Sequence, residues 1–320
     1  MPNEKGLKER QKNPRDEFYT TYGTIEAEIE TYPKEVFCGK TIYLPCDAEW
    51  SNFFKYFLDN FEKLQLRGLY ASSIEGKYVK ITDPKDIVWK DMRDDFFFKT
   101  GDFRSQHARE LMKEADIIIT NPPFSLFLAF FQQCVQYQKK FLCIAYQAIL
   151  SSKHVSREII QGRVTVGNDC PSAMYFTMSP EYEITSVNGE GLASVCCVWL
   201  TNLPTREKHL PKNDVEDIEA FVNSCTRFTK FPEVINIMAI KDIPTNYDGV
   251  MGVPVTFFKY HNPKEYKIFG INGYVSNSHG LSLVGQQKES FGRLFIQKIK
   301  KSPVERCVES RRHFGEDMIA

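Results

Sequence analysis

The sequence of 320 residues lacks a net charge and lacks any long apolar run. Its 41 Lys and Arg residues balance 41 Asp and Glu residues, so this is not a globally basic nucleic-acid binder. Contacts with phosphates must then come from local clusters. No apolar stretch approaches the length of a membrane span, and the polar residues 1–15 do not resemble a signal peptide. We therefore expect a cytoplasmic protein with no membrane partner.

Regular cysteine spacing is also missing. The nine cysteines form no C-x-x-C pair, and Cys143, Cys196 and Cys197 sit in apolar runs, where free Cys behaves as a small hydrophobe. This pattern predicts a reduced protein with no disulfide framework and no metal site.

Several catalytic motifs are absent. The sequence contains no Walker A, H-E-x-x-H or G-x-S-x-G pattern, and the segment Leu44–Ser51 has no glycine. A nicotinamide enzyme needs glycine there, because the pyrophosphate must approach the backbone closely. A cofactor without phosphate does not need it.

The most informative feature that is present is Asn121-Pro122-Pro123-Phe124, directly after the apolar run Ala115–Thr120. Proline fixes its φ at about −65° and pushes the preceding residue into an extended conformation, so Asn121 continues outward from the strand. The Asn121 amide oxygen and the Pro122 carbonyl can then accept hydrogen bonds from one exocyclic amino group. Phe124 can stack on a base, which contributes about 1–3 kcal/mol. This arrangement predicts methylation of a planar amino group. The simpler reading is that the prolines end a strand and Phe124 is core.

From residue 38 to 205 the chain alternates between strand and helix patterns. The spacing of apolar residues predicts helices through Ser51–Leu64 and from Phe127 to Val135. A strand–helix–strand unit implies a parallel sheet covered on both faces, hence an α/β fold. Residues 74–100 fit neither pattern and indicate an insertion. The predicted strands are Thr41–Leu44, Gly68–Ala71, Ala115–Thr120, Phe141–Tyr146, Arg163–Gly167, Ala173–Thr177 and Ser194–Thr201, the last a candidate antiparallel strand.

From about residue 206 the composition and the hydrophobic pattern of the sequence change. Prolines recur between Pro204 and Pro263, long helical patterns become rare, and Leu294–Ile299 is the one clear strand near the end. We predict a catalytic domain with an N-terminal arm at residues 1–205. Residues 206–320 are predicted to form a smaller mixed region.

Polar residues follow several predicted strands, and ligands bind at the carboxyl ends of strands in an open parallel sheet. Cys46-Asp47 follows the first strand, Ser72 the second, and Asp102-Phe103 the run Phe96–Phe98. These groups suit S-adenosylmethionine, which has no phosphate. Asp47 would hold the ammonium group, Asp102 the adenine amino group, and Phe103 the adenine ring. Taken singly, Asp47 could instead be a helix N-terminal acid or cap, and Asp102 could instead be a turn residue.

Five blocks of sequence resemble one known family. They occur in the order found in EcoRI-type DNA adenine-N6 methyltransferases, and the resemblance covers about residues 16 to 300. The blocks are Asp16–Thr20 (D-E-F-Y-T), Ser51–Phe57 (S-N-F-F-K-Y-F), Gly101–Ser105 (G-D-F-R-S), Asn121–Phe127 (N-P-P-F-S-L-F) and Tyr247–Pro254 (Y-D-G-V-M-G-V-P).

The resemblance implies a Rossmann-like methyltransferase sheet, S-adenosylmethionine as donor and duplex DNA as substrate. The first block corresponds to a motif that closes over the donor. Cys46–Asp47 stands in the donor motif without its usual glycines, and Ser72 stands where many relatives have a ribose-binding acid. The site residues that the resemblance implies are Asn121, Pro122, Pro123 and Phe124 for catalysis, and Phe18, Tyr19, Thr20, Cys46, Asp47, Phe53, Ser72, Asp102, Phe103 and Asn121 for binding the donor.

The function that follows is direct methyl transfer to an adenine flipped out of the duplex. No catalytic base is needed, because an arylamine becomes acidic once it is methylated. The alternatives are an RNA methyltransferase acting on adenine N6 or guanine N2 and an inactive methyltransferase fold that binds nucleic acid. A protein glutamine methyltransferase ranks last, since it would more often carry Tyr in the fourth position of the motif.

Target recognition is predicted for 206–320 and for the loops around 74–100 and 150–160. A cognate restriction endonuclease would share the DNA site without binding this protein directly. The Tyr247–Pro254 block is read as a structural turn. Candidate phosphate contacts are the tail residues 1–15 and Lys153, His154, Arg157, Arg163, Lys298, Lys300, Lys301, Arg306, Arg311 and Arg312, although an ordinary solvated surface explains each of them too.

Overall fold

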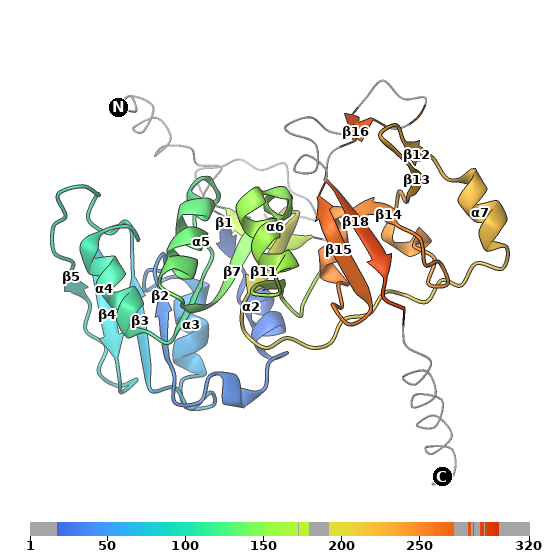
Figure 1. Cartoon of the computed structure of the whole chain (residues 1–320). Helices are drawn as coiled ribbons and strands as arrows, with labels where there is room; N and C mark the ends of the chain where they lie inside the picture. The colour runs from blue at the N-terminus through green and yellow to red at the C-terminus, as the bar shows by residue number, and fades with distance from the viewer. Residues whose placement is uncertain are drawn as a thin grey trace, which may run out of the picture. The chain divides into compact units, whose positions relative to one another are not determined.

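The computed structural model describes residues 18–171, 173–178, 192–271, 281–282, 284, 289–290 and 292–300 (Figure 1). Two compact units are present, Met1–Arg206 and Glu207–Ala320. The tail of residues 1–15 and the first two residues of the Asp16–Thr20 block lie outside the described residues. The same is true of four of the basic residues near the carboxyl terminus, Lys301, Arg306, Arg311 and Arg312.

An eight-stranded sheet with the order β5-β4-β3-β2-β6-β7-β11-β8 forms the first unit. Its four central strands, from β3 to β7 in this order, run parallel, and β11 runs antiparallel to both of its neighbours. The strands are β2 (Thr41–Leu44), β3 (Gly68–Ser72), β4 (Lys77–Ile81), β5 (Lys90–Asp91), β6 (Ile117–Thr120), β7 (Lys140–Tyr146), β8 (Thr165–Val166) and β11 (Cys197–Thr201).

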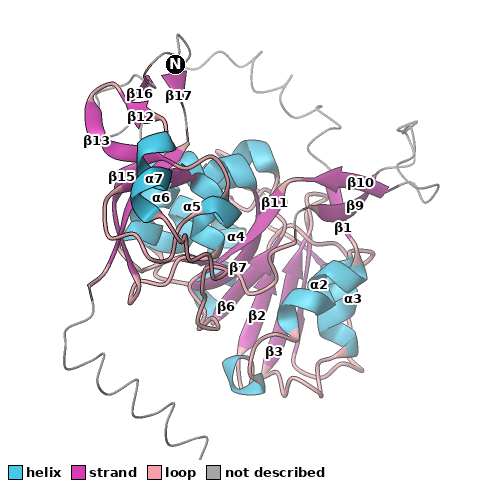
Figure 2. Ribbon diagram, turned by 90° about the vertical axis from the view of Figure 1, so that its right-hand side faces the viewer, coloured by secondary structure: helices cyan, strands magenta, loops and turns pink. Residues whose placement is uncertain are grey.

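Helices cover both faces of this sheet, with α2 and α3 on one side and α4, α5 and α6 on the other (Figure 2). Because both faces are covered, β2, β6 and β11 are buried along their whole length. The helices are α2 (Tyr22–Ile29), α3 (Asn52–Asp59), α4 (Gln106–Glu114), α5 (Phe127–Gln136) and α6 (Lys153–Ile160), with short 3-10 turns η2 (Lys34–Val36), η3 (Phe124–Leu126) and η4 (Gln147–Ser151).

The direction of winding reverses between β2 and β6. From β2 the chain passes through α3 to β3 on one side, and it returns through α4 to β6 on the other side of β2. In an open α/β sheet, ligands bind in the crevice at such a switch point. The reversal therefore marks the carboxyl ends of β2 and β6 as the place for a site.

The predicted fold class is confirmed: the first unit is a Rossmann-like α/β sheet. Strands at each predicted position from 41 to 177 are present, within two residues at each end. The predicted helix Ser51–Leu64 is shorter, since α3 ends at Asp59. Residues 74–100, predicted as an insertion, contain the antiparallel strands β4 and β5.

The prediction of one strand over Ser194–Thr201 was wrong. The chain changes sheets at Cys196, whose carbonyl accepts a hydrogen bond from Gln147 N at 2.9 Å. The part before Cys196 pairs with β9, and the part after it is β11, which is antiparallel as predicted. The separate three-stranded sheet has the order β1-β9-β10 and consists of β1 (Phe18–Thr20), β9 (Met174–Met178) and β10 (Leu192–Val195).

The second unit contains a five-stranded sheet with the order β12-β13-β14-β18-β15. Predicted strand Leu294–Ile299 is present as β18, and β14 pairs with it at the centre of the sheet. A Cβ on Gly252 would lie 2.4 Å from the Phe228 ring, so this glycine leaves room for the small core around Phe228 and Phe295. The elements are α7 (Ile218–Ser224), β12 (Arg227–Phe228), β13 (Phe231–Asn236), η5 (Ile240–Asp242), β14 (Met251–Pro254), η6 (Val255–Lys259), β15 (Tyr266–Ile271), β18 (Arg293–Lys298) and the separate pair β16 (Leu281–Ser282) and β17 (Glu289–Ser290).

None of the helices in the described part of the chain combines the length and the apolar content needed to cross a bilayer.

Candidate active site

A cavity of about 590 Å³ opens at the carboxyl edge of the large sheet, at the switch point. Its walls come from the segments after β2, β3 and β6, the loop before α4, the start of α3, and strands β1 and β9. The volume suits a ligand of nucleoside size. The predicted site residues that line it are Tyr19, Thr20, Cys46, Asp47, Phe53, Asp102, Phe103, Asn121 and Pro123.

Asp47 follows β2 and presents a buried carboxylate to this cavity. Its Oδ1 accepts a hydrogen bond from the Ser51 hydroxyl at 2.5 Å, and its Oδ2 accepts one from the Thr120 hydroxyl at 2.8 Å. Both donors are neutral, and burial raises the pKa of Asp47 to about 6. A carboxylate accepts about four hydrogen bonds, so Asp47 keeps acceptor positions for a cationic group in the cavity.

Two buried hydroxyls on the cavity wall, Thr20 Oγ1 and Ser73 Oγ, have no hydrogen-bond partner among the described residues. Buried polar groups are normally paired, so these hydroxyls indicate where a polar ligand or a water binds. Thr20 is held in place because Asn52 Nδ2 donates to its carbonyl oxygen at 2.8 Å. That bond fixes β1 to the start of α3.

Gly101 allows the loop before α4 to lie against the end of β3. Its φ is +92°, and a Cβ there would come within 2.5 Å of the Ser73 carbonyl oxygen and 2.6 Å of the Ile74 carbonyl oxygen. Only glycine adopts this conformation at such a close approach. The loop thereby carries the next two residues, Asp102 and Phe103, to the cavity wall.

The Asp102 carboxylate is already engaged inside its own loop. Arg104 donates to it through Nε at 2.9 Å, through Nη2 at 2.7 Å and through its backbone N at 2.8 Å. This ion pair raises the pKa of Arg104, and it leaves Asp102 with little capacity for a further donor. The Phe103 ring is buried and packs edge-to-face on Phe130, with 5.7 Å between ring centroids.

The Asn-Pro-Pro-Phe motif leaves β6 at the cavity. Asn121 and Pro123 line the cavity and are half-buried, and Pro123 leads into η3. The Phe124 ring lies beside Tyr146, with centroids 6.1 Å apart and planes at 50°. Tyr146 ends β7 and is 47% exposed, so the two rings offer aromatic surface next to Asn121.

Some predicted residues are not brought to the cavity wall. Ser72 is fully buried, bonded to the Tyr43 hydroxyl at 2.6 Å, because successive side chains of β3 point to opposite faces and Ser73 takes the wall position. Pro122 is buried and Phe124 half-buried, and neither lines the cavity. The Phe18 backbone is part of β1, but its side chain lies outside the described residues.

Other lining residues were missed by sequence reasoning. Glu75, an exposed carboxylate three residues after β3, was overlooked because the acid was sought at Ser72 itself. Thr177 gave no local signal, since it reaches the wall only through the pairing of β9 with β1. The lining residues to which the sequence assigned no role in the site are Pro45, Ala48, Trp50, Ser51, Asn52, Lys55, Ser73, Ile74, Glu75, Gly101, Leu126 and Thr177.

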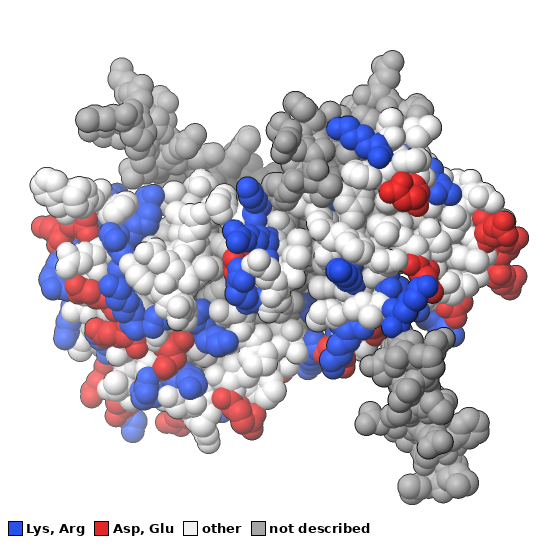
Figure 3. All heavy atoms as spheres, viewed as in Figure 1, with Lys and Arg blue, Asp and Glu red and all other residues white. Residues whose placement is uncertain are grey.

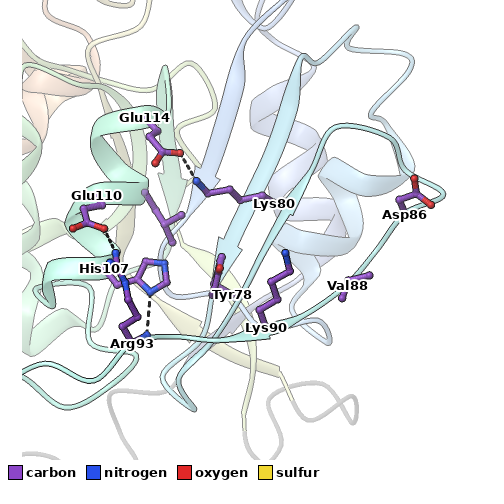
Figure 4. A pocket seen from close by; sticks show the side chains of 10 residues that line it. Tyr78, Lys80, Asp86, Val88, Lys90, Arg93, His107, Glu110 and Glu114 are labelled. Atoms are coloured by element: carbon purple, nitrogen blue, oxygen red, sulfur yellow. Dashed lines mark hydrogen bonds and ion pairs between the residues drawn. The ribbon is translucent and has the colours of Figure 1, made fainter.

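A smaller hollow of about 350 Å³ lies between β4 and α4 (Figure 4). Lys80 is paired with Glu114 and Arg93 with Glu110 across it. Since these charges neutralise one another, the hollow offers no concentrated charge to a ligand. No predicted site residue lines it. Among the described residues, no group of three or more His, Cys, Asp or Glu side chains is placed to hold a metal ion.

A doubly wound sheet with an acidic, aromatic-lined cavity at its switch point and Asn-Pro-Pro-Phe at the same edge defines a methyltransferase of the Rossmann-like class. Comparison with known sequences then gives the family. The chain belongs to the adenine-specific methyltransferase EcoRI family, whose sequence model matches residues 6–309. It is a site-specific, adenine-specific DNA methyltransferase, which confirms the family and the function predicted from the sequence.

Three relatives of this chain are named type II methyltransferases. M.EcoRI of Escherichia coli is 35% identical over 290 residues, covering 82% of this chain and 87% of the relative. M.MgeORF184P of Mycoplasma genitalium is 32% identical over 273 residues, covering 80% and 83%. M.MpnI of Mycoplasma pneumoniae is 28% identical over 315 residues, covering 90% and 96%. No solved structure matches this chain.

Proposed function

We propose that the cavity binds S-adenosylmethionine and that the residues around it place the donor against an adenine flipped out of duplex DNA. The donor, when bound, supplies an electrophilic methyl group on a positively charged sulfur. The chemistry of the wall fits this molecule. Asp47 offers a buried carboxylate with neutral neighbours to the ammonium group, and Thr20 and Ser73 offer buried hydroxyls.

The nucleoside part of the donor fits the wall formed by β3 and the loop before α4. Glu75 is placed to accept hydrogen bonds from ribose hydroxyls, in the role that the sequence assigned to Ser72. Phe103 offers ring edge and face to adenine. Because Arg104 occupies most of the Asp102 carboxylate, we propose that Asp102 mainly holds this loop in shape.

The acceptor side is formed by the motif after β6. We propose that the Asn121 amide oxygen and the Pro122 carbonyl oxygen accept hydrogen bonds from the adenine amino group and aim its lone pair at the methyl group. Phe124, with Tyr146 beside it, provides aromatic surface for the base. Catalysis then rests on positioning and on acceptors that favour the developing positive charge on nitrogen. No residue has to remove a proton before transfer.

DNA contacts are proposed for two regions. Lys153 and Arg157 are exposed on α6, near the carboxyl edge of the sheet, and are proposed to contact phosphates. Figure 3 shows Lys and Arg side chains gathered over the part of the face where Figure 1 draws this helix. Arg163 is a weaker candidate, because Glu158 holds its guanidinium through two bonds of 2.6 Å.

The second unit, Glu207–Ala320, is proposed to recognise the target sequence. Two of its basic residues are engaged within the unit, since Lys298 Nζ donates to the Thr245 carbonyl and Lys300 pairs with Asp248 at 3.8 Å. The packing of Gly252 against Phe228 supports a structural role for the Tyr247–Pro254 block.

The names of the relatives, which are called type II methyltransferases, support a proposal about the biological setting. We propose that this chain protects the sites of a cognate restriction endonuclease that reads the same sequence without binding the methyltransferase.

One observation carries the proposed mechanism: Asn121 and Asp47 leave the neighbouring parallel strands β6 and β2 at the same edge and line one cavity. The test is methyl transfer from labelled S-adenosylmethionine to unmethylated duplex DNA and to RNA, with the product nucleoside identified by mass spectrometry. Wild type should form N6-methyladenine in DNA. Asn121→Ala should lose about a hundredfold or more in kcat, as for other single acceptor or donor groups at a reacting centre.

A suitable control is Gln136→Ala, which removes an exposed amide at the end of α5 and should leave the rate unchanged. Retained activity in Asn121→Ala, or labelling of RNA in preference to DNA, would contradict the proposal.

A further inference from the structure

Phe96 and Phe97 are the most exposed large apolar side chains in the described part of the chain, at 94% and 82%. Their rings contact each other edge-to-face, with centroids 5.1 Å apart. They lie on the loop between β5 and α4 (Figure 1). Two adjacent aromatic rings left in water are unfavourable for folding and mark a contact surface.

The loop presents these rings because Asp95 holds its backbone. Asp95 Oδ1 accepts hydrogen bonds from Phe97 N at 2.8 Å and Phe98 N at 3.0 Å, and its Oδ2 accepts one from Gln106 N, the first residue of α4, at 2.5 Å. The loop is therefore tied to the helix. Phe96 and Phe97 are held outward without collapsing onto the protein surface.

The charges at the base of the loop are mixed. Arg104 and Arg109 lie 5.0 Å and 5.5 Å from the Phe98 ring centroid, but Arg104 is paired with Asp102, which leaves the exposed Lys99 beside the two rings. Charge therefore does not choose the partner. The chain is a DNA methyltransferase, and this loop is continuous with the wall of its active-site cavity, so we assign the exposed rings to DNA.

The loop is attached to the rim of the active-site cavity. Met92 N donates to the Gly76 carbonyl at 2.7 Å, which places the start of the loop at the carboxyl edge of the sheet. Gly101, at the other end, lines the cavity. Three residues separate Phe97 from Gly101, and the four residue-to-residue steps span at most about 14 Å. The two phenylalanines therefore lie near the rim of the cavity in which Asn121 and Asp47 meet.

We propose that Phe96 and Phe97 form a wedge that enters the base stack of the duplex beside the target adenine and stabilises the flipped state. This inference rests on the proposed action on flipped adenine in duplex DNA. Extrusion of a base leaves its neighbours unstacked, and apolar side chains inserted between base steps compensate for that loss. The wedge makes no contact with the reacting atoms, so it lowers the cost of reaching the reactive geometry.

The test compares wild type with the double variant Phe96→Ala/Phe97→Ala on two duplexes that carry the methylation site mapped in labelled DNA. One duplex pairs the target adenine with thymine. The other places an abasic site opposite it, which removes most of the cost of extrusion. The double variant should lose about tenfold or more in kcat/KM on the paired duplex and stay within about threefold of wild type on the abasic duplex. Val88→Ala removes a different exposed apolar side chain (61%) and should match wild type on both.

A second readout follows extrusion directly. With 2-aminopurine at the target position, the fluorescence increase on forming the complex should be smaller for the double variant, while S-adenosylmethionine affinity stays unchanged. An unchanged rate on the paired duplex, or an equal loss on both duplexes, overturns the wedge and leaves the proposed function intact. If wild type itself transfers no methyl group to either duplex, the proposed function fails and the wedge with it.

Discussion

At the scale of single residues, Asp47 has the least ordinary environment in the site. Its carboxylate is buried and receives hydrogen bonds only from the hydroxyls of Ser51 and Thr120. Burial raises its pKa from 3.8 to about 6, so the ionised form costs stability above about pH 6, and this cost is relieved as the pH falls toward 3.8. A cation bound beside Asp47 would offset the same cost. The buried charge of Asp47 therefore lowers the stability of the fold and raises its affinity for a cationic ligand.

This gives a prediction about pH. Affinity for S-adenosylmethionine should be constant between about pH 6 and pH 7, where the donor's amino group is charged, and fall by about tenfold per pH unit below pH 6, because protonation of Asp47 removes the charge that attracts the ammonium group. Asp47→Asn should bind the donor more weakly at pH 8 and should not show this pH dependence. Its melting temperature at pH 7 should equal or exceed that of wild type, since the buried charge is gone. Titration calorimetry between pH 5 and 8, with a thermal melt, measures both.

The control for this titration is Glu75→Gln, which changes an exposed carboxylate of the same cavity. It should keep the fall in affinity below pH 6. The assignment to Asp47 would be refuted by an Asp47→Asn variant that still shows the wild-type pH profile.

At the scale of elements, the site depends on the close approach of two loops. Gly101 touches the backbone after β3 so closely that any side chain would separate the loops. The sequence around Gly101 shows no helical or strand pattern. Only the folded structure shows that a glycine is required there, because the backbone of Ser73 and Ile74 lies directly beside it.

We therefore predict that Gly101→Ala loses about 1–3 kcal/mol of stability and at least about tenfold in donor affinity, as for a displaced binding wall. Gly39→Ala is the matched control, since Gly39 also has a positive φ, +68°, but nothing lies within 4 Å of its Cβ position. It should lose about 1 kcal/mol and bind the donor normally. Chemical denaturation and calorimetry distinguish the two. Equal donor affinities in both variants would argue against the loop contact.

Element prediction from the sequence worked where a segment is buried on a regular face. The apolar runs at β2, β6 and β7 and the helical spacing in α5 specify their elements locally. The prediction of elements failed at Cys196, where the chain passes from one sheet to another within a single apolar run. Residues 74–100 resisted interpretation because β4 is exposed on one face and β5 has only two residues.

At the scale of the whole molecule, the absence of net charge means that DNA binding must depend on local clusters. Each phosphate contact adds about 0.9 to the slope of log K against log salt concentration. Lys153→Ala and Arg157→Ala should each weaken DNA binding and reduce this slope by about 1. Lys40→Ala removes an exposed lysine just before β2, at the opposite edge of the sheet, and should leave the slope unchanged.

Fluorescence anisotropy with a site-containing duplex at several salt concentrations measures these slopes. If Lys153→Ala and Arg157→Ala keep the wild-type slope, α6 does not contact phosphates and the electrostatic contacts lie elsewhere.

By itself, the sequence determined the family and its function, because five blocks of sequence resemble that family, and it determined the central strands, because apolar runs specify buried strands locally. In the segment Ala115–Phe124 an apolar strand, an amide, two prolines and an aromatic ring are contiguous, so their relation is set by the local backbone. Tertiary structure decided what depends on parts of the chain that are far apart in sequence. It joined Asp47 to Thr120, placed Ser73 and Glu75 on the cavity wall in place of Ser72, and brought Thr177 to Tyr19. These contacts arise from sheet pairing and side-chain alternation, which no local pattern records.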